Sequence, residues 1–297
     1  MEYNTPNEMD YPVHHLCLPD DRVLAFSEFG CPEGIPVFYH HGWPACRLEA
    51  ILYEEQAKAA GVRLISLDRP GFGESTFQDQ RTLLDWPDDL SRVGDFLGFD
   101  QFHLLGHSGG GPYVAACAAK IPHRLLGTTI VAGLSPMTDR RTREGMRFMN
   151  QVLLSLGRRF PWLLNRMMKL TRKMSQDPEQ MKKGMADLPE NDKAIMFAML
   201  PRLTDLMKVS FAQGTAGATR EGRIYASPWG FELSEISVPV TIWQGTLDVN
   251  VPQSNGKLFA DEIPKAKFHL IEGEGHFSLA VNHGERILRD LVGGGEL

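Results

Sequence analysis

The sequence predicts an α/β fold in which a mostly parallel sheet is covered by helices on both faces. Short, nearly continuous apolar runs alternate with helix-length segments over the first 135 residues, and the same rhythm returns near the C-terminal end. Continuous apolar strands are typical of a parallel sheet that is buried on both faces. The alternation of strand and helix is typical of a doubly wound sheet.

Seven runs are expected to form strands: residues 22–29, 35–40, 62–67, 101–105, 125–132, 240–243 and 267–271. Five segments between or after them are expected to form helices: residues 48–60, 83–97, 109–120, 254–263 and 277–291. This order places a helix after most of the strands, as a parallel sheet requires for its crossover connections.

The rhythm breaks after Pro136. Residues 138–209 are helix-forming with proline and glycine punctuation, and residues 214–219, rich in glycine, alanine and threonine, are expected to be flexible. The simplest organisation is one α/β core, formed by residues 1–136 and 226–297, with a helical lid (cap) insertion at residues 137–225. The glycine tail at residues 293–295 is expected to be disordered.

Composition excludes several classes of protein. The 42% of hydrophobic and 23% of charged residues are ordinary for a globular protein, and no apolar run reaches the roughly 18 residues of a membrane span. The first ten residues do not resemble a secretory signal, and the net charge of −6 argues against binding of nucleic acid. The four cysteines lack zinc or disulfide spacing. We therefore expect a cytoplasmic protein, without cofactor or metal, that acts on a small molecule; the sequence does not determine its oligomeric state.

The insertion has a composition of its own. Residues 137–210 hold 15 lysines and arginines against 8 aspartates and glutamates, and 11 of the 13 methionines. One interpretation is a solvated set of helices whose methionines fill a core. The other is a basic lid over an adaptable, methionine-lined pocket, which would favour apolar or anionic substrates. Contact of residues 158–173 with an anionic membrane surface is a third and less favoured interpretation.

The most informative motif is Gly-x-Ser-x-Gly at residues 106–110, between an apolar strand and a predicted helix. A serine on such a sharp turn adopts a strained backbone conformation, and Gly106 and Gly110 leave room for the chain to pass. The turn exposes the Ser108 hydroxyl and directs the helix's first amides toward developing negative charge. Ser108 is therefore the candidate nucleophile.

A serine nucleophile needs a base, and the base needs an orienting acid. His276 lies on a glycine-rich loop just after the last predicted strand, and Asp248 lies on the loop after residues 240–243. Active residues of open α/β sheets gather at such strand ends. Taken singly, His276 could be an ordinary loop histidine and Asp248 a helix cap; the order Ser108, Asp248, His276 favours a catalytic triad.

Candidate donors to an oxyanion follow the strand at residues 35–40. A tight turn at Gly42 can direct the Trp43 N–H into the same crevice as the Gly109 N–H, whereas Pro44 has no N–H to donate. His40 and His41 are adjacent on a strand and face opposite ways, so both are expected to be structural. His103 and His107 have helical metal spacing but lie in a strand, so no metal site is expected there.

These motifs together resemble the capped, esterase and epoxide-hydrolase-like branch of the α/β-hydrolase-fold enzymes. The matching segments are residues 41–44 (HGWP), 68–75 (DRPGFGES), 106–110, 228–231 (PWGF) and 275–277 (GHF). The resemblance covers residues 20–135 and 225–290. It implies Ser108 as nucleophile, His276 as base and Asp248 as acid, with the insertion as a lid that forms much of the substrate pocket. It also implies that Asp68 and Arg69 belong to a structural turn.

Two departures narrow the activity that the resemblance implies. Epoxide hydrolases of this type use an aspartate nucleophile, whereas position 108 is serine, which favours acyl chemistry. The sequence Asp68-Arg69-Pro70 differs from the Asp-Gln-Arg usual in proline iminopeptidases, which disfavours peptidase activity.

Three functions stay open at this point. The first is a serine hydrolase that cleaves a carboxylic ester of a small-to-medium, largely apolar substrate through an acyl-enzyme. The second is the same triad acting on a lactone, a thioester or a C–C bond, or in a non-hydrolytic step, on a specialised metabolite. The third, least favoured, is a small-molecule receptor that keeps the fold.

Overall fold

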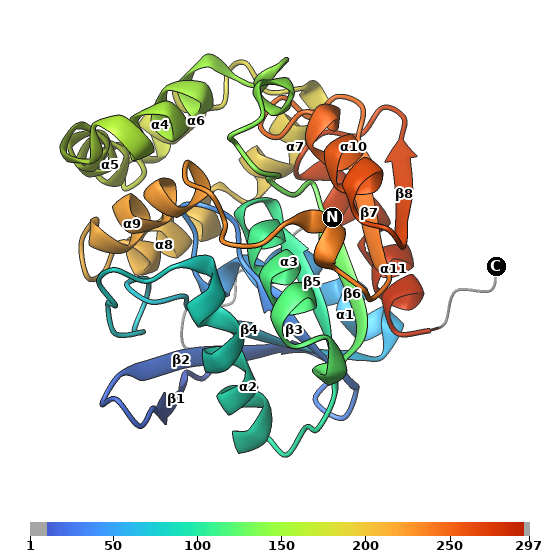
Figure 1. The fold of residues 1–297 in the computed structure, drawn as a ribbon. Coiled ribbons are helices and arrows are strands. Elements are labelled where there is room, and N and C mark those ends of the chain that lie inside the picture. Colours follow the sequence, from blue (N-terminus) through green and yellow to red (C-terminus); the bar gives the residue numbers. More distant parts are fainter. Residues whose placement is uncertain (1–10, 294–297) are drawn as a thin grey trace.

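A single eight-stranded sheet forms the centre of the protein, whose computed structural model describes residues 11–293 (Figure 1). The strands follow the order β1-β2-β4-β3-β5-β6-β7-β8 across the sheet. β2 is antiparallel to both of its neighbours, and the other pairs are parallel. The bounds are β1 His14–Cys17, β2 Val23–Gly30, β3 Ile35–His40, β4 Val62–Leu67, β5 Phe102–His107, β6 Leu125–Val131, β7 Val240–Gly245 and β8 Ala266–Ile271.

Helices cover both faces of the sheet, which confirms the predicted architecture. α1 and α11 contact each other and the strands on one face, while α2, α3 and α10 pack on the other. Their bounds are α1 Glu54–Ala60, α2 Trp86–Phe96, α3 Gly111–Lys120, α10 Gln253–Glu262 and α11 Ser278–Leu291.

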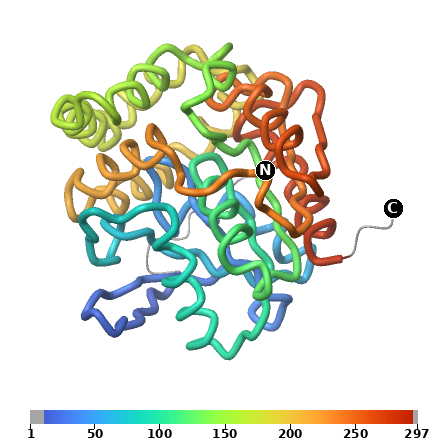
Figure 2. Tube along the Cα trace, viewed as in Figure 1, coloured from blue at the N-terminus to red at the C-terminus, as the bar shows by residue number. Residues whose placement is uncertain are grey.

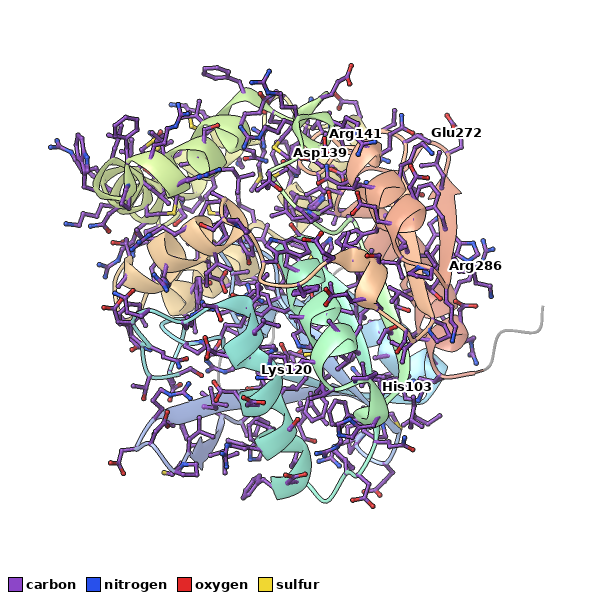
Figure 3. The ribbon with its side chains drawn as sticks, in the orientation of Figure 1. His103, Lys120, Asp139, Arg141, Glu272 and Arg286 are labelled. Carbon is purple, nitrogen blue, oxygen red and sulfur yellow. The ribbon has the colours of Figure 1, made fainter. Side chains whose placement is uncertain are left out.

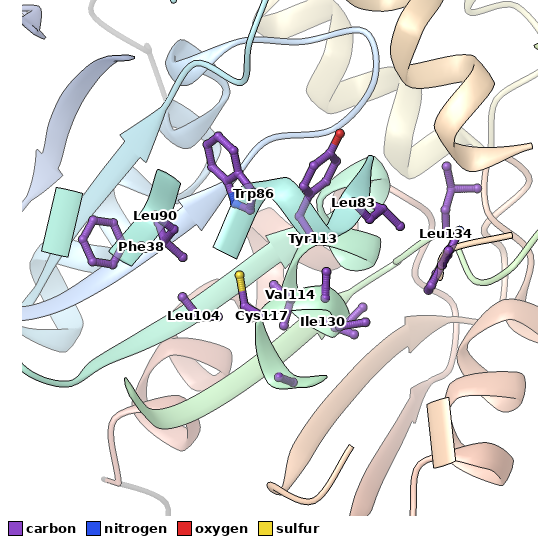
Figure 4. Close-up of a cluster of buried hydrophobic side chains, with 14 of the residues drawn as sticks. Phe38, Leu83, Trp86, Leu90, Leu104, Tyr113, Val114, Cys117, Ile130 and Leu134 are labelled. Atoms are coloured by element: carbon purple, nitrogen blue, oxygen red, sulfur yellow. The ribbon is translucent and has the colours of Figure 1, made fainter. Parts of the chain in front are cut away.

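Two apolar clusters, one on each face, form most of the core. Successive residues of a strand point to opposite faces, so Phe38 and Leu104 join one cluster while Val37 and Leu105 join the other. Figure 4 shows part of the first cluster, where residues of α2 and α3 pack on β3, β5 and β6. All six residues of β5 are buried. The continuous apolar runs in the sequence follow from this burial on both sides.

Six helices lie between β6 and β7, and we call residues 137–225 the cap segment. Their bounds are α4 Phe148–Arg159, α5 Pro161–Met174, α6 Pro178–Gly184, α7 Glu190–Ala198, α8 Leu200–Ser210 and α9 Ala216–Tyr225. Figure 2 shows the two flanking parts of the chain side by side, with the segment between them on the upper left. Asp139 caps the short turn at the start of this segment by accepting from the Arg141 N–H at 2.8 Å (Figure 3). The division into domains at residues 136/137 and 225/226 stays a prediction.

The predicted strands agree with the structure to within one or two residues at their ends, but one strand was missed. β1 is a short edge strand whose residues are mostly exposed, so its sequence carries no apolar run. Each of the first three predicted helices begins with a 3₁₀ turn before the α-helix: Arg47–Tyr53, Leu83–Asp85 and Ser108–Gly110. Most of the predicted glycine tail lies outside the described residues. No helix within the described range is long and apolar enough to cross a bilayer.

The expectation that residues 214–219 are flexible is wrong, because α9 begins at Ala216. The small residues serve close packing. A Cβ on Gly217 would meet the Gly71 carbonyl oxygen at 2.3 Å, and a Cβ on Gly222 would meet the Trp43 ring at 3.0 Å. Glycine in a helix permits such close approach of two backbones, at some cost in helix propensity.

Candidate active site

Ser108 lies on a sharp turn at the end of β5, before α3. Its φ angle of 54° is in the left-handed region that side chains rarely adopt. A Cβ on Gly110 would come within 2.0 Å of the His40 carbonyl oxygen, and one on Gly106 within 2.7 Å of the Gly110 carbonyl oxygen. Both neighbouring positions therefore require glycine, as the sequence predicts.

His276 and Asp248 are joined on loops beyond the ends of β8 and β7. The His276 Nδ1 atom lies 2.7 Å from Asp248 Oδ2, and both side chains are buried. The other carboxylate oxygen, Oδ1, accepts from the backbone N–H groups of Asn250 and Val251 at 2.8 Å each. Asp248 thus holds the ring with one oxygen while the loop backbone holds the other.

This environment favours the protonated imidazole of His276. Burial lowers its pKa, but the charge of Asp248 and the hydrogen bond to it outweigh burial, so the pKa is raised above its ordinary value. The His107 ring stacks on the His276 ring at 4.9 Å, and its Nε2 lies 3.2 Å from the His276 carbonyl oxygen. Burial lowers the pKa of His107 to about 3, so this neighbour stays neutral.

Ser108 and His276 line the same cavity. Among the hydrogen bonds within residues 11–293, none joins Ser108 Oγ to the His276 ring. Catalytic hydrogen bonds of this kind are often long in enzymes without a ligand and tighten when substrate binds. The structure therefore brings His276 and Asp248 into direct contact and Ser108 into the same space.

The two candidate oxyanion donors lie side by side. The backbone nitrogen of Trp43 is 3.2 Å from the point where a Cβ would sit on Gly109. The Ser108 carbonyl accepts from the Leu134 N–H at 3.0 Å. Since N–H and C=O point in opposite directions across a trans peptide, this bond turns the Gly109 N–H away from Leu134.

Glu49 is a buried acid that the sequence did not indicate. Its Oε2 accepts from the Gly42 N–H at 2.5 Å and from the Tyr39 hydroxyl at 2.8 Å. Burial raises the pKa of the Glu49 carboxyl, and the side chain lines the cavity beside Ser108. From the 3₁₀ turn Arg47–Tyr53, Glu49 thereby ties residues 41–44, which we call the oxyanion loop after their proposed role, to the end of β3.

Asp192 on α7 is a second buried acid that the sequence did not indicate. Its carboxylate accepts from the backbone N–H groups of His276, Phe277 and Ser278 at 2.8–2.9 Å. A Cβ on Gly275 would lie only 2.5 Å from Asp192 Oδ2, so glycine there lets the carboxylate approach. Through Asp192, the cap segment therefore supplies acceptors to the N-terminal N–H groups of α11 and holds the loop that carries His276.

A cluster of buried charged side chains lies behind the oxyanion loop. Arg69 pairs with Glu221 of α9, and Arg81 also donates to Glu221, at 3.1 Å. The Tyr113 and Tyr225 hydroxyls lie 2.9 and 3.0 Å from the same carboxylate. Sequence reasoning treated Arg69 as part of a structural turn and gave no sign of its partner, about 150 residues away.

The histidines expected to be structural, His40 and His41, are both buried. His41 Nε2 accepts from the Arg69 N–H at 3.3 Å, so the ring proton is on Nδ1, which donates to the Gly42 carbonyl at 2.9 Å. Burial lowers the pKa of His40 to about 3. Within the described part of the chain, no three His, Cys, Asp or Glu side chains gather as a metal site would require.

A cavity of about 770 Å³ opens above Ser108 and His276, between the sheet and the cap segment. Its wall is mostly apolar and includes eight methionines from the cap segment: Met149, Met167, Met174, Met181, Met185, Met196, Met199 and Met207. This arrangement agrees with the interpretation of the methionines as the wall of a pocket. Several of them, such as Met196 and Met199, are also buried among core residues, so the two interpretations overlap.

The sequence model of the protein family described as "alpha/beta hydrolase fold" matches residues 35–183 of this chain. The chain belongs to the alpha/beta hydrolase fold family. The resemblance found in the sequence motifs is thereby confirmed.

Several relatives have names that describe different reactions. The chain is 29% identical over 126 residues to a bifunctional esterase/perhydrolase of Acinetobacter calcoaceticus, covering 41% of this chain and 45% of that one. It is 24% identical over 258 residues to a proline iminopeptidase of Lacticaseibacillus rhamnosus, covering 83% and 85%. The chain spans 45% of the esterase/perhydrolase and 30% of another curated relative.

A solved structure supports the fold over nearly the whole chain. The structure of a thermophilic esterase from Thermogutta terrifontis covers 94% of this chain and 96% of that one, with a TM-score of 0.64 and 23% identity. At this identity the likeness concerns the fold alone.

Proposed function

We propose that the protein is a serine hydrolase that cleaves a carboxylic ester of a small-to-medium, largely apolar substrate. Ser108 Oγ attacks the ester carbonyl, and His276 Nε2 takes its proton and returns it to the leaving alcohol. Asp248 orients the imidazole and stabilises its positive charge. The N–H groups of Trp43 and Gly109 stabilise the oxyanion, and water then cleaves the acyl-enzyme.

One observation carries this proposal: a strained serine on an elbow faces the same cavity as a histidine whose other nitrogen is 2.7 Å from a buried carboxylate. The positive φ of Ser108 costs backbone energy. The arrangement has no evident structural purpose that would offset this cost. The methionine-rich wall supports a largely apolar substrate, and a cavity of about 770 Å³ lies within the range typical of small-molecule sites. A cytoplasmic location stays a prediction.

The decisive experiment combines labelling with a substrate panel. A fluorophosphonate probe should modify Ser108, identified by mass spectrometry, and Ser108→Ala should abolish both labelling and hydrolysis of p-nitrophenyl butyrate. Because members of a triad act as a unit, we expect kcat to fall by about 10⁴-fold or more. Activity on esters that persists in Ser108→Ala would contradict the proposal.

The same panel separates the alternatives that use this triad. Thioesters, lactones and a β-diketone tested beside the esters show which bond is cleaved fastest, since the fold by itself does not determine the reaction. The name of the esterase/perhydrolase relative supports including esters first. Tight binding of a small ligand without turnover of any panel member would favour the receptor function.

A further inference from the structure

The peptide between Gly42 and Trp43 is held from its carbonyl side by a charged residue. The Gly42 carbonyl accepts from Arg69 Nη2 at 2.9 Å and from His41 Nδ1 at 2.9 Å. Across a trans peptide the N–H points away from the carbonyl. Arg69 therefore fixes the direction of the Trp43 N–H, which points away from the guanidinium, and the Trp43 nitrogen itself lies 3.2 Å from the point where a Cβ would sit on Gly109.

The preceding peptide is held at both ends. The His41 carbonyl accepts from Arg69 Nη1, and the Gly42 N–H donates to Glu49 Oε2. Two successive peptides of the oxyanion loop thus take their orientation from one guanidinium. A cation on the carbonyl side also polarises the peptide and makes its N–H a stronger donor.

Arg69 is in turn held by the cap segment. Its Nε donates to Glu221 Oε1 and its Nη2 to Glu221 Oε2 at 2.9 Å, and both side chains are fully buried. A buried guanidinium needs such a paired carboxylate, and the planar fork of arginine can serve carboxylate and carbonyls at once. Burial raises the pKa of Glu221, but Arg69 outweighs it and lowers the pKa to about 2, so the pair stays ionised at neutral pH.

We propose that Arg69 and Glu221 are positioning residues that aim and polarise the Trp43 N–H for the oxyanion. We call the pair the Arg69–Glu221 clamp. Through Glu221, helix α9 of the cap segment sets the geometry of the oxyanion loop. The proposal rests on the proposed function, because it gives the Trp43 N–H its role in an acyl-transfer reaction.

The first test replaces one carboxylate oxygen of Glu221 by an amide nitrogen. In Glu221→Gln one acceptor becomes a donor, which cannot accept from the guanidinium. We expect kcat for p-nitrophenyl butyrate, per site labelled by the fluorophosphonate, to fall about 10- to 100-fold, less than for loss of a whole oxyanion donor. KM should stay within about threefold, because the ester's ground-state contacts are untouched.

A trifluoromethyl ketone gives a readout that a merely structural role would not move. Ser108 Oγ adds to its carbonyl, the serine proton passes to His276, and the new oxyanion occupies the oxyanion hole. The affinity of this inhibitor should weaken by about the same factor as kcat/KM, as for a transition-state analogue.

The control is a pair of the same kind away from the cavity. Arg63 on β4 donates to both oxygens of Glu28 on β2, at 2.6 and 2.7 Å. Glu28→Gln makes the same chemical change, so kcat and inhibitor affinity should stay within about twofold of wild type.

A second variant decides the matter if Glu221→Gln does not fold. Arg69→Lys keeps the positive charge, but a single ammonium cannot serve Glu221 and both carbonyls together, so it should show the same loss of kcat at nearly constant KM. The clamp is overturned if either folded variant keeps wild-type kcat and inhibitor affinity. That result, with Ser108→Ala inactive, would leave the proposed function standing; an active Ser108→Ala would end the function itself.

Discussion

In the proposed mechanism, His276 determines the pH at which Ser108 can be activated. The base accepts a proton only when its imidazole is neutral, and its pKa is raised by Asp248. The acidic limb of kcat/KM against pH should therefore have its midpoint above 6.5, the ordinary value for histidine. Hydrolysis of p-nitrophenyl butyrate across pH 5–9 measures this midpoint, and a midpoint well below 6.5 would count against His276 as the base.

Replacing the acid should move that limb in the opposite direction. In Asp248→Asn the charge that raises the pKa is lost while burial still lowers it, so the midpoint should shift to lower pH. The rate should also fall, by up to about 10⁴-fold, because the amide no longer holds the correct tautomer. A profile of kcat/KM for this variant with an unchanged midpoint would show that Asp248 does not control His276.

The residues that the sequence predicted differ in kind from those it missed. Ser108, Asp248 and His276 each lie just after an apolar strand in a local pattern that can be read within about ten residues. Glu49, Asp192 and Glu221 act on segments that only the tertiary structure brings near. Each is an ordinary acidic residue in its local sequence, and its role comes from backbone N–H groups or an arginine on another element.

Helix α9 depends on glycine to approach the turn at residues 68–75. In Gly217→Ala the new Cβ would overlap the Gly71 carbonyl oxygen, at 2.3 Å, so helix and turn must separate. Overpacking of this kind costs about 1–3 kcal/mol. Since Glu221 lies one turn further along, we also expect kcat to fall. Urea denaturation and ester kinetics on the same preparation measure the two effects.

Gly184 provides the matched control. It ends α6 in the same cap segment, and a Cβ placed on it would meet nothing within 4 Å. Gly184→Ala should change the free energy of unfolding by about 0.5 kcal/mol or less. If both alanine variants behaved alike, the close approach of α9 would have no energetic significance.

The elements that the sequence predicted best are those whose pattern reflects two-sided burial. β3 and β4 have the predicted bounds, because a strand between two helical layers is mostly apolar. β1 was missed because an exposed edge strand needs no apolar residues. α9 was mistaken for a flexible stretch because its glycines serve contact with another segment, which local sequence does not reveal.

At the scale of the whole molecule, the cap segment contacts the core at the two loops that carry groups of the proposed mechanism. Glu221 reaches the oxyanion loop through Arg69, and Asp192 binds three successive amides that begin with His276. Asp192→Ala would leave these buried N–H groups without their acceptor, which costs about 1–3 kcal/mol. The His276 loop should then loosen, and kcat should fall with it.

An aspartate that caps a helix within the cap segment separates the two effects. Asp177 accepts from the Glu179 N–H at 2.9 Å at the exposed start of α6. Asp177→Ala should cost about 0.5–2 kcal/mol in stability, as for other helix caps, with no change in kcat. Thermal unfolding and active-site-normalised kcat for both variants test this difference, and an equal loss of kcat in the two would argue against a special contact at His276.

The methionines above Ser108 have a consequence for evolution and engineering. Their unbranched thioether side chains rotate easily, so this wall of the cavity can adjust to substrates of different shape. None of the eight belongs to the loops that carry the reacting groups. Replacing one of these methionines by a branched or aromatic residue should therefore narrow the range of accepted esters, while the reaction at Ser108 stays the same.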